Sequence, residues 1–163
     1  MEKTKEQIKE VEKIVVNVGV GRASQQAQFE DKILPEIAKE LAIITGQKAS
    51  PRQAKKSIAG FKTRAGQIVG LAVTLRGARR DDFLHRLINL VLPRVKDFRG
   101  LAEKNVDANG NLNIGLKEQT VFPEIDVEKS KVTFGIQITV VPKKKQRSSA
   151  IDFYRRSGVP LKK

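Results

Sequence analysis

The sequence has no cysteine, which excludes disulfides and metal sites with thiolate ligands. This absence suits a reducing cytosol without proving that location. No uninterrupted apolar run approaches the roughly 20 residues that a membrane-spanning helix needs. The N-terminus is charged, with Glu2, Lys3, Lys5 and Glu6, and is unlike a signal peptide. We therefore expect neither a membrane span nor a secretion signal.

Acidic residues are also scarce relative to basic ones. The chain has 18 Asp and Glu residues against 32 Lys and Arg residues, so its net charge is +14 and its pI is about 10.2. A small folded protein with this charge repels itself unless a polyanion neutralises it. Nucleic acid is the usual polyanion, because each neutralised phosphate releases counterions and adds affinity. A membrane surface is the other candidate.

Length and hydrophobic content predict a folded domain. The chain has 163 residues, of which 39% are hydrophobic, and this is enough to bury a core. Neither an internal repeat nor a linker interrupts the sequence. We therefore expect a single domain over residues 1–163, with residues 1–12 and 142–163 as candidate flexible ends. Residues 1–13 are charged and suit either a helical turn or a frayed end.

The spacing of apolar residues predicts an α+β fold. The expected strands are residues 14–18, 68–76, 112–116 and 132–141, and the expected helices are residues 29–44, residues 83–95 and a short stretch near 151–154. Pro35 should kink or restart the first helix, and Thr45-Gly46 should end it. Asp81 and Asp82 should stabilise the first turn of the second helix, which Pro93 should end.

The predicted strands have two different faces. One set of alternate residues is uniformly apolar and must be covered, so we expect an antiparallel sheet in two layers with helices on one face. The other set is small and polar and comprises Asn17, Gly70, Ala72, Thr74, Arg76, Asn113, Gly115, Lys117, Thr133, Gly135, Gln137 and Thr139. This set forms either an ordinary solvated face or a face whose small residues let an RNA backbone approach closely. It contains no aromatic residue, so recognition there should use shape and phosphates rather than base stacking.

Basic residues gather in two segments. The first contains Lys48, Arg52, Lys55, Lys56, Lys62 and Arg64. The glycines Gly60 and Gly66 flank its last two cations and indicate a protruding basic hairpin arm, a form that reaches into grooves. The second segment, Lys143-Lys144-Lys145 with Arg147, is either a phosphate-binding tail or a solvated, mobile one.

The patterns that could carry catalysis are incomplete. Gly19-Val20-Gly21 lies between a predicted strand and a predicted helix, as a dinucleotide-binding turn does, but Ser24 stands where the third glycine is needed. A tight strand-to-helix turn is the better interpretation. His85 is the only histidine and is expected to be a surface or packing residue. We expect no enzymatic activity, no metal site and no cofactor.

Six motifs follow one another along the chain. They are Asn17-Val18-Gly19-Val20-Gly21, Thr45-Gly46-Gln47-Lys48, Ala54 to Lys62, Val73-Thr74-Leu75-Arg76-Gly77, Leu92 to Gly100, and Lys117-Glu118-Gln119 with Phe122-Pro123-Glu124-Ile125. In this order they resemble the bacterial form of the large-subunit ribosomal protein five family, over about residues 13–141. The resemblance implies a structural protein of the central protuberance that binds 5S rRNA, supports translation and resides in the cytoplasm.

The resemblance also implies partners and site residues. The partners are 5S rRNA, 23S rRNA, peptidyl-site tRNA, a small-subunit head protein across an intersubunit bridge, and other proteins of the central protuberance. Three residues match the family's polar contacts to 5S rRNA, and nearby cations complete the expected set: Asn17, Gln47 and Thr74, with Lys48, Arg52, Lys55 and Arg76. The arm directed toward the tRNA and the small subunit is matched by Gly60, Phe61, Lys62, Thr63, Arg64 and Gly66. Ala49 and Ile68 depart from the family, which commonly has proline there.

Two other functions compete with this interpretation. A free-standing RNA chaperone or RNA-binding regulator could use the same polar face away from the ribosome. A membrane-surface protein ranks third, because the basic residues lie on a sheet rim and on loops rather than beside an apolar helical stripe.

Overall fold

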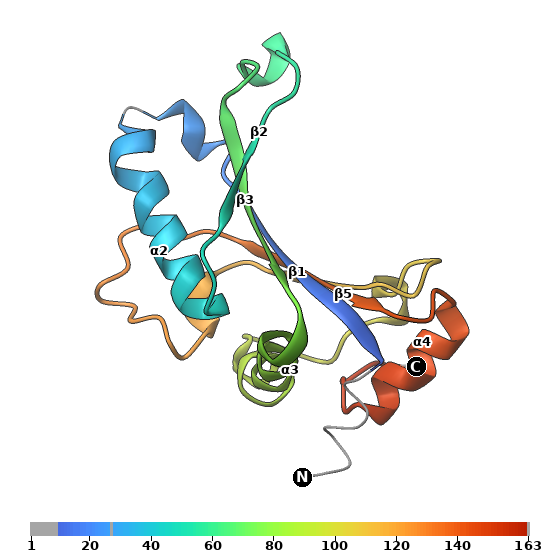
Figure 1. Cartoon of the computed structure of the whole chain (residues 1–163). Helices are drawn as coiled ribbons and strands as arrows, with labels where there is room; N and C mark the ends of the chain where they lie inside the picture. The colour runs from blue at the N-terminus through green and yellow to red at the C-terminus, as the bar shows by residue number, and fades with distance from the viewer. Residues whose placement is uncertain (1–9, 27, 163) are drawn as a thin grey trace. The chain divides into compact units, whose positions relative to one another are not determined.

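The computed structural model describes residues 10–26 and 28–162. Five strands form one antiparallel sheet in the spatial order β2-β3-β1-β5-β4, and three α-helices accompany it, which confirms the predicted α+β class (Figure 1). The strands are β1 (Val11–Gly19), β2 (Ser50–Gln53), β3 (Ile68–Leu75), β4 (Leu112–Leu116) and β5 (Ile136–Pro142). The helices are α2 (Leu34–Thr45), α3 (Gly77–Arg86) and α4 (Arg147–Arg156).

The chain divides into two compact units. The first unit comprises residues 1–16, 74–116 and 137–163, and the second comprises residues 17–73 and 117–136. The single domain over residues 1–163 stays a prediction. Within the first unit, part of the C-terminal segment taken as a candidate flexible end forms α4.

In the second unit, the helical segment before the basic stretch is interrupted as expected at Pro35. Residues 29–33 form a π-helical turn, and α2 then begins with Pro35 in its first turn, where proline's missing N–H has no intrahelical partner to lose. Gly46 ends α2 in the left-handed conformation, with φ +67°, and its N–H donates to Ala42 O at 2.8 Å. The buried side of α2 carries Ile37, Leu41 and Ile44.

In the first unit, α3 begins at Gly77, six residues before the predicted start at Phe83. A π-helical turn over residues 87–91 and a 3-10 turn over residues 92–94 continue it to just beyond Pro93, as expected. The first turn of α3 holds no acidic residue, so the role assigned to Asp81 and Asp82 is wrong. Their carboxylates pair instead with Arg80, at 2.6 Å, and Arg86, at 3.0 Å. The early start was missed because the residues before Phe83 are mostly polar and show no apolar period.

A turn before β4 packs against α4 in the first unit. The Asp107 carboxylate accepts the backbone N–H groups of Asn109, at 2.9 Å, and Asn111, at 2.8 Å. Burial acts to raise the pKa of Asp107, but the hydrogen bonds from Asn111 and Asn109 outweigh it and lower that pKa. Gly110 adopts φ +79°, and a Cβ there would lie 2.7 Å from Ala150 Cβ, so this turn requires a glycine at position 110. Tyr154 is fully buried, with its hydroxyl 2.9 Å from Gly110 O and 3.1 Å from Val140 O, and burial raises its pKa.

One strand, β2, was not predicted, and two others begin several residues away from their predicted start. β1 begins at Val11 rather than Ile14. β5 begins at Ile136 rather than Val132, although residues 132–135 continue the alternation. In the second unit, Phe134 N–H donates to the Gln119 side chain, at 3.0 Å, so this backbone group is bound to a loop.

Gln119 fixes the 117–135 segment within the second unit. Its side chain is fully buried. Its Nε2 atom donates to Val132 O at 2.6 Å, Ser130 Oγ at 3.0 Å and Glu40 Oε2 at 3.2 Å, while Oε1 accepts from Phe134. A single amide therefore ties the segment to itself and to α2.

Replacing Gln119 with leucine should lower the free energy of unfolding by about 1–3 kcal/mol, because it leaves buried polar groups without partners. Urea denaturation followed by circular dichroism measures the change. Thr120→Ala is the matched control, since Thr120 is half-buried and its hydroxyl donates to the exposed carboxylate of Glu118, at 3.3 Å. Equal stability of the Gln119 variant and the wild type would contradict the assigned anchoring role.

Candidate nucleic-acid interface

Part of the predicted RNA-facing set is buried by the chain's own strands. β2 pairs with β3 in antiparallel register, with Arg52 opposite Gly70 and Ser50 opposite Ala72. Gly70 and Ala72 are both buried. A Cβ at Gly70 would lie 3.3 Å from Val18 O, so the backbone that approaches this glycine is the protein's own β1 and not an RNA. For these two residues, burial excludes both alternatives that the sequence left open, a solvated position and an RNA-facing one.

The β2–β3 connection, residues 54–67, is ordered by its own backbone. Ala54 N–H donates to Gln67 O at 2.8 Å, and farther along the connection Ile58 N–H donates to Thr63 O at 2.9 Å. Residues 59–61 form a 3-10 turn, which Lys62 ends in the left-handed conformation at φ +51°. Of the two flanking glycines, Gly66 adopts the left-handed conformation, at φ +85°, whereas Lys62 rather than Gly60 does so in the 3-10 turn.

The segment after β1 holds the connection from one side. Gln25 Nε2 donates to Phe61 O at 2.8 Å, and Gln67 Nε2 donates to Ser24 O and Oγ at 3.1 and 2.9 Å. Gly19-Val20-Gly21 leads into this segment, where Val20 N–H donates to Val69 O at 2.9 Å. The helix that follows spans only Ala23–Gln25, which agrees with the interpretation of a tight turn rather than a dinucleotide site.

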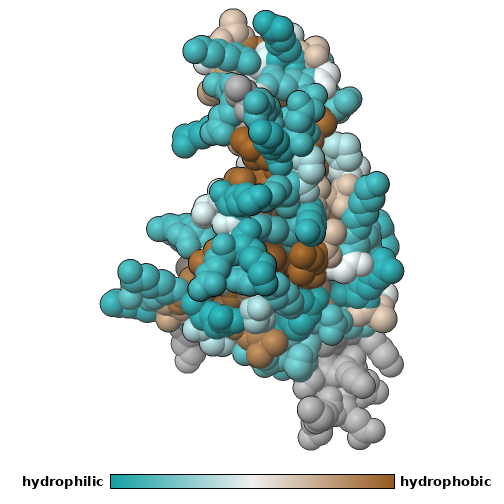
Figure 2. Space-filling model, turned by 90° about the vertical axis from the view of Figure 1, so that its left-hand side faces the viewer, coloured by the Kyte–Doolittle hydropathy of each residue, from teal (hydrophilic) through white to brown (hydrophobic). Residues whose placement is uncertain are grey.

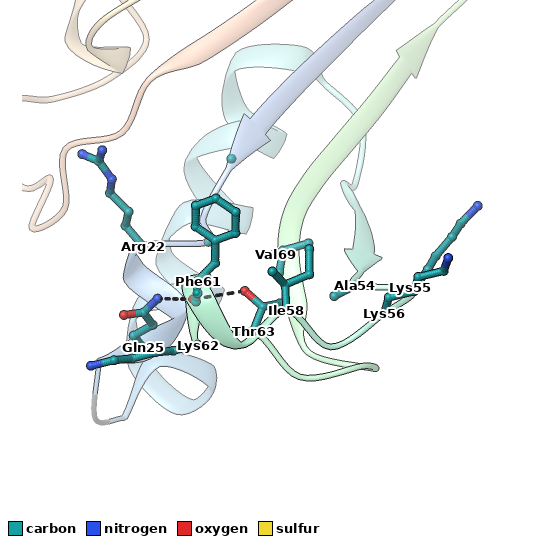
Figure 3. Close-up of a pocket in the computed structure, with 13 residues that line it drawn as sticks. Arg22, Gln25, Ala54, Lys55, Lys56, Ile58, Phe61, Lys62, Thr63 and Val69 are labelled. Atoms are coloured by element: carbon teal, nitrogen blue, oxygen red, sulfur yellow. Dashed lines mark hydrogen bonds between the residues drawn. The ribbon is translucent and has the colours of Figure 1, made fainter.

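Between this segment and the connection lies a groove of about 1060 Å³, which we call the basic groove (Figure 3). Its distinctive lining residues are Arg22, Lys55, Lys56, Ile58, Phe61 and Lys62. None of the described residues that line it is acidic. Phe61 is 71% exposed and Ile58 is 50% exposed, so apolar and cationic side chains share one open surface.

Among the described residues, the cations of the first basic segment have no carboxylate partner. The sequence has no acidic residue between Glu40 and Asp81. Six cations of the first basic segment are exposed, namely Lys48, Arg52, Lys55, Lys56, Lys62 and Arg64. Within the described ranges, no ion pair involves any of them, whereas Arg80 and Arg86 in the first unit both have carboxylate partners. The six charges are thus available to an external anion.

The molecular surface is also polar, as expected for a protein that binds a polar partner. The face shown in Figure 2 is mostly hydrophilic, with apolar patches confined between the polar side chains. No helix in the described part of the chain has both the length and the apolar character needed to cross a membrane.

The predicted 5S-binding residues fall in both units. The second unit carries Asn17, half-buried on β1, and Gln47, half-buried after α2. It also carries the exposed cations Lys48, Arg52 and Lys55. The first unit carries Thr74, half-buried on β3, and Arg76, exposed where α3 begins.

The residues predicted for the arm lie together in the β2–β3 connection, and Gly60, Phe61, Lys62 and Thr63 line the basic groove. Arg64 and Gly66 are outside the groove lining. Lys55, predicted to bind 5S rRNA, lines the same groove as the arm residues. Sequence reasoning missed Arg22 and Gln25, because they are distant in sequence from the connection and no spacing pattern links them to it.

Elsewhere, His85 is exposed, as predicted. Among the residues that the structure describes, no group of histidine and carboxylate side chains is arranged to hold a metal ion.

Two family models match the chain. One, described as ribosomal protein L5, matches residues 5–64, and the other, described as the C-terminus of the same ribosomal protein family, matches residues 68–161. A protein described as large ribosomal subunit protein uL5 from Syntrophomonas wolfei is 47% identical over 156 residues, which cover 96% of this chain and 85% of that protein. Proteins of the same description from Chloroflexus aggregans and Spiroplasma kunkelii are each 46% identical, over 96% of this chain and 84% and 85% of their own lengths.

Proposed function

Because the chain belongs to the ribosomal protein L5 family, a family of structural proteins of the large ribosomal subunit, we propose that it binds 5S rRNA within that subunit. It helps to attach the 5S rRNA to the 23S rRNA in the central protuberance, beside other ribosomal proteins. Its β2–β3 connection acts as an arm that contacts peptidyl-site tRNA and the head of the small subunit. The family is not enzymatic, and the protein supports translation in the cytoplasm as part of the ribosome.

The observation that carries this proposal is the set of six exposed cations without a carboxylate partner among the described residues. Concentrated positive charge raises the free energy of the isolated protein through self-repulsion. RNA phosphates remove this repulsion and release their own counterions. Binding should therefore be strong at low salt and fall steeply as salt rises.

Polar side chains can distinguish 5S rRNA from other RNAs, which phosphate contacts alone cannot do. Asn17 and Gln47 are half-buried in the second unit, so their amides have restricted positions. The Gln47 backbone is tied to the end of α2, because its N–H donates to Thr45 Oγ1 at 3.4 Å and that hydroxyl donates to Leu41 O at 2.7 Å. Together with Thr74 in the first unit, these side chains can form hydrogen bonds with ribose and base edges, while Lys48, Arg52, Lys55 and Arg76 hold phosphates.

The arm is suited to a different contact. Lys62 and Arg64 are exposed, and the backbone hydrogen bonds of the connection do not involve their side chains. Lys62 ends the 3-10 turn of the connection, whereas Arg64 N–H donates to Gln67 Oε1 at 3.0 Å. The two side chains are therefore held on an ordered backbone but are available to a tRNA or to the small subunit.

Replacing Asn17, Gln47 and Thr74 together with alanine should weaken 5S rRNA binding by at least about 1–3 kcal/mol, the cost of one lost hydrogen bond that leaves a partner unpaired. Filter binding with radiolabelled 5S rRNA at several salt concentrations measures the affinity. The slope of log affinity against log salt should stay as in the wild type, because the substitutions remove no cation.

Asn89→Ala is the control, since Asn89 is an exposed residue outside every predicted RNA-facing set, and its amide donates to His85 O at 2.9 Å. If the triple variant bound 5S rRNA like the wild type, the three residues would have no part in recognition.

Replacing Lys62 and Arg64 with glutamate should leave binding to isolated 5S rRNA nearly unchanged, because the arm contacts other partners. The same change should speed dissociation of peptidyl-site tRNA from reconstituted ribosomes, since it sets negative charge against phosphate. The matched control is Lys32→Glu with Lys39→Glu, which makes the same charge change at exposed positions of the helical segment. A large loss of 5S affinity with unchanged tRNA dissociation would reverse the assignment of the two surfaces.

A further inference from the structure

We propose that the basic groove binds one unpaired nucleotide of an RNA strand, with its base stacked on the Phe61 ring and its flanking phosphates held by the groove's cations. The inference rests on the proposed function in one respect, that the partner is RNA. The new element is that the protein recognises a base of this RNA in addition to its phosphates.

The first observation is the exposure of Phe61. Its side chain is 71% exposed, the largest fraction among the exposed large hydrophobic residues of the described chain. Among the described residues, no aromatic ring or cation stacks on it. Figure 3 shows the ring standing in the groove, away from the side of the backbone where Gln25 binds its carbonyl. The ring face is therefore open to a planar ligand.

The second observation is that the backbone holds this exposed ring in place. Gln25 Nε2 binds Phe61 O at 2.8 Å, and Thr63 Oγ1 donates to the same carbonyl at 3.3 Å. Lys62 follows with φ +51°, a conformation that a residue with a side chain adopts at an energetic cost. Strain of this kind persists where the surrounding structure enforces it, and it commonly marks a ligand contact. A mobile loop tip would need neither the strain nor the two hydrogen bonds.

The third observation is the charge around the ring. In Figure 3, Arg22 and Lys62 lie on one side of the apolar centre formed by Phe61 and Ile58, and Lys55 and Lys56 lie on the other. Cations on both sides of an aromatic face match a nucleotide strand, in which each base is flanked by two phosphates. Proteins that bind single-stranded nucleic acid combine these same two elements, a positive groove and an aromatic platform.

The groove favours an unpaired base over a duplex. A base inside an RNA helix presents only its edges, because its faces are covered by neighbouring base pairs. The face of Phe61 can be covered only by a base that is splayed out of its stack. A volume of about 1060 Å³ is sufficient for one nucleotide with its phosphates.

The test uses the full-length protein and two single-stranded probes. The first is a seven-residue oligouridylate RNA with 2-aminopurine at its centre, which is bright in the free strand because uridines stack weakly and is quenched when it stacks on another ring, and the second has an abasic site at the centre. The wild type should bind the first probe at least about fivefold more tightly than the second and quench its fluorescence, as expected for one base stacked on an aromatic side chain. Phe61→Leu should abolish both the difference in affinity and the quenching, whereas Phe61→Trp should retain them.

Two further variants distinguish the contribution of base stacking to probe binding from the contributions of charge and of exposed apolar surface. Lys62→Ala should lower the salt slope by about 0.7 for both probes, the value for one phosphate of a single strand, whereas Phe61→Leu should leave that slope unchanged. Val127→Ala is the control for exposed apolar surface in the same unit, since Val127 is 65% exposed and lies outside the groove lining, and it should behave as the wild type. Phe61 is exposed and its bonded group is the backbone carbonyl, so its variants should fold normally.

Equal affinity of the wild type for the two probes, or quenching that persists in Phe61→Leu, would overturn the proposal. Weakened subunit joining of Phe61→Leu with unchanged binding to both probes would also overturn it and would assign Phe61 to a protein partner. The proposed function is tested separately by 5S rRNA filter binding of the Asn17, Gln47 and Thr74 variants, none of which changes the ring. If Phe61→Leu bound both probes like the wild type while the Asn17, Gln47 and Thr74 variants lost 5S rRNA affinity, only the proposal of a stacked base would be rejected.

Discussion

Unneutralised positive charge between Glu40 and Asp81 is the constraint on which the rest of the molecule depends. In the part of the chain that the structure describes, the acidic groups that pair do so mostly with cations outside this stretch, as Asp126 does with Lys129 and Glu36 with Lys131. The cations of the stretch, from Lys48 to Arg64, are exposed and lack such partners. Folding thus leaves the like charges of residues 48–64 without neutralisation in the second unit, a cost that an RNA partner removes.

The second unit resists this repulsion by hydrogen bonding. β2 pairs with β3, Ala54 and Gln67 close the base of the connection, and Gln25 and Gln67 tie it to the segment after β1. Each of these bonds uses a backbone group or a neutral amide, so none neutralises a cation. The backbone that carries the charges is therefore held in place, and the charges remain available to a ligand.

Periodicity sufficed to predict the elements that have one buried face. β3, β4 and α2 were expected within a few residues of their true bounds, because alternation or three- and four-residue spacing reports burial directly. It failed where a tertiary contact decides the outcome. β5 starts late, as the backbone at Phe134 is bound to Gln119, and α3 starts early over a polar stretch that periodicity does not detect. The family motifs predicted site residues such as Asn17 and Thr74. The basic groove could not be predicted in this way, because Arg22 and Gln25 reach the β2–β3 connection only through the fold.

The central claim is that this protein is a stable component of the large ribosomal subunit and not a free-standing RNA chaperone. Sedimentation of cell extracts through low-magnesium sucrose gradients, which separate the ribosomal subunits, tests this most directly. The account predicts that the protein sediments with the large subunit and its 5S rRNA. A protein that stays near the top of the gradient, apart from both subunits, would contradict it.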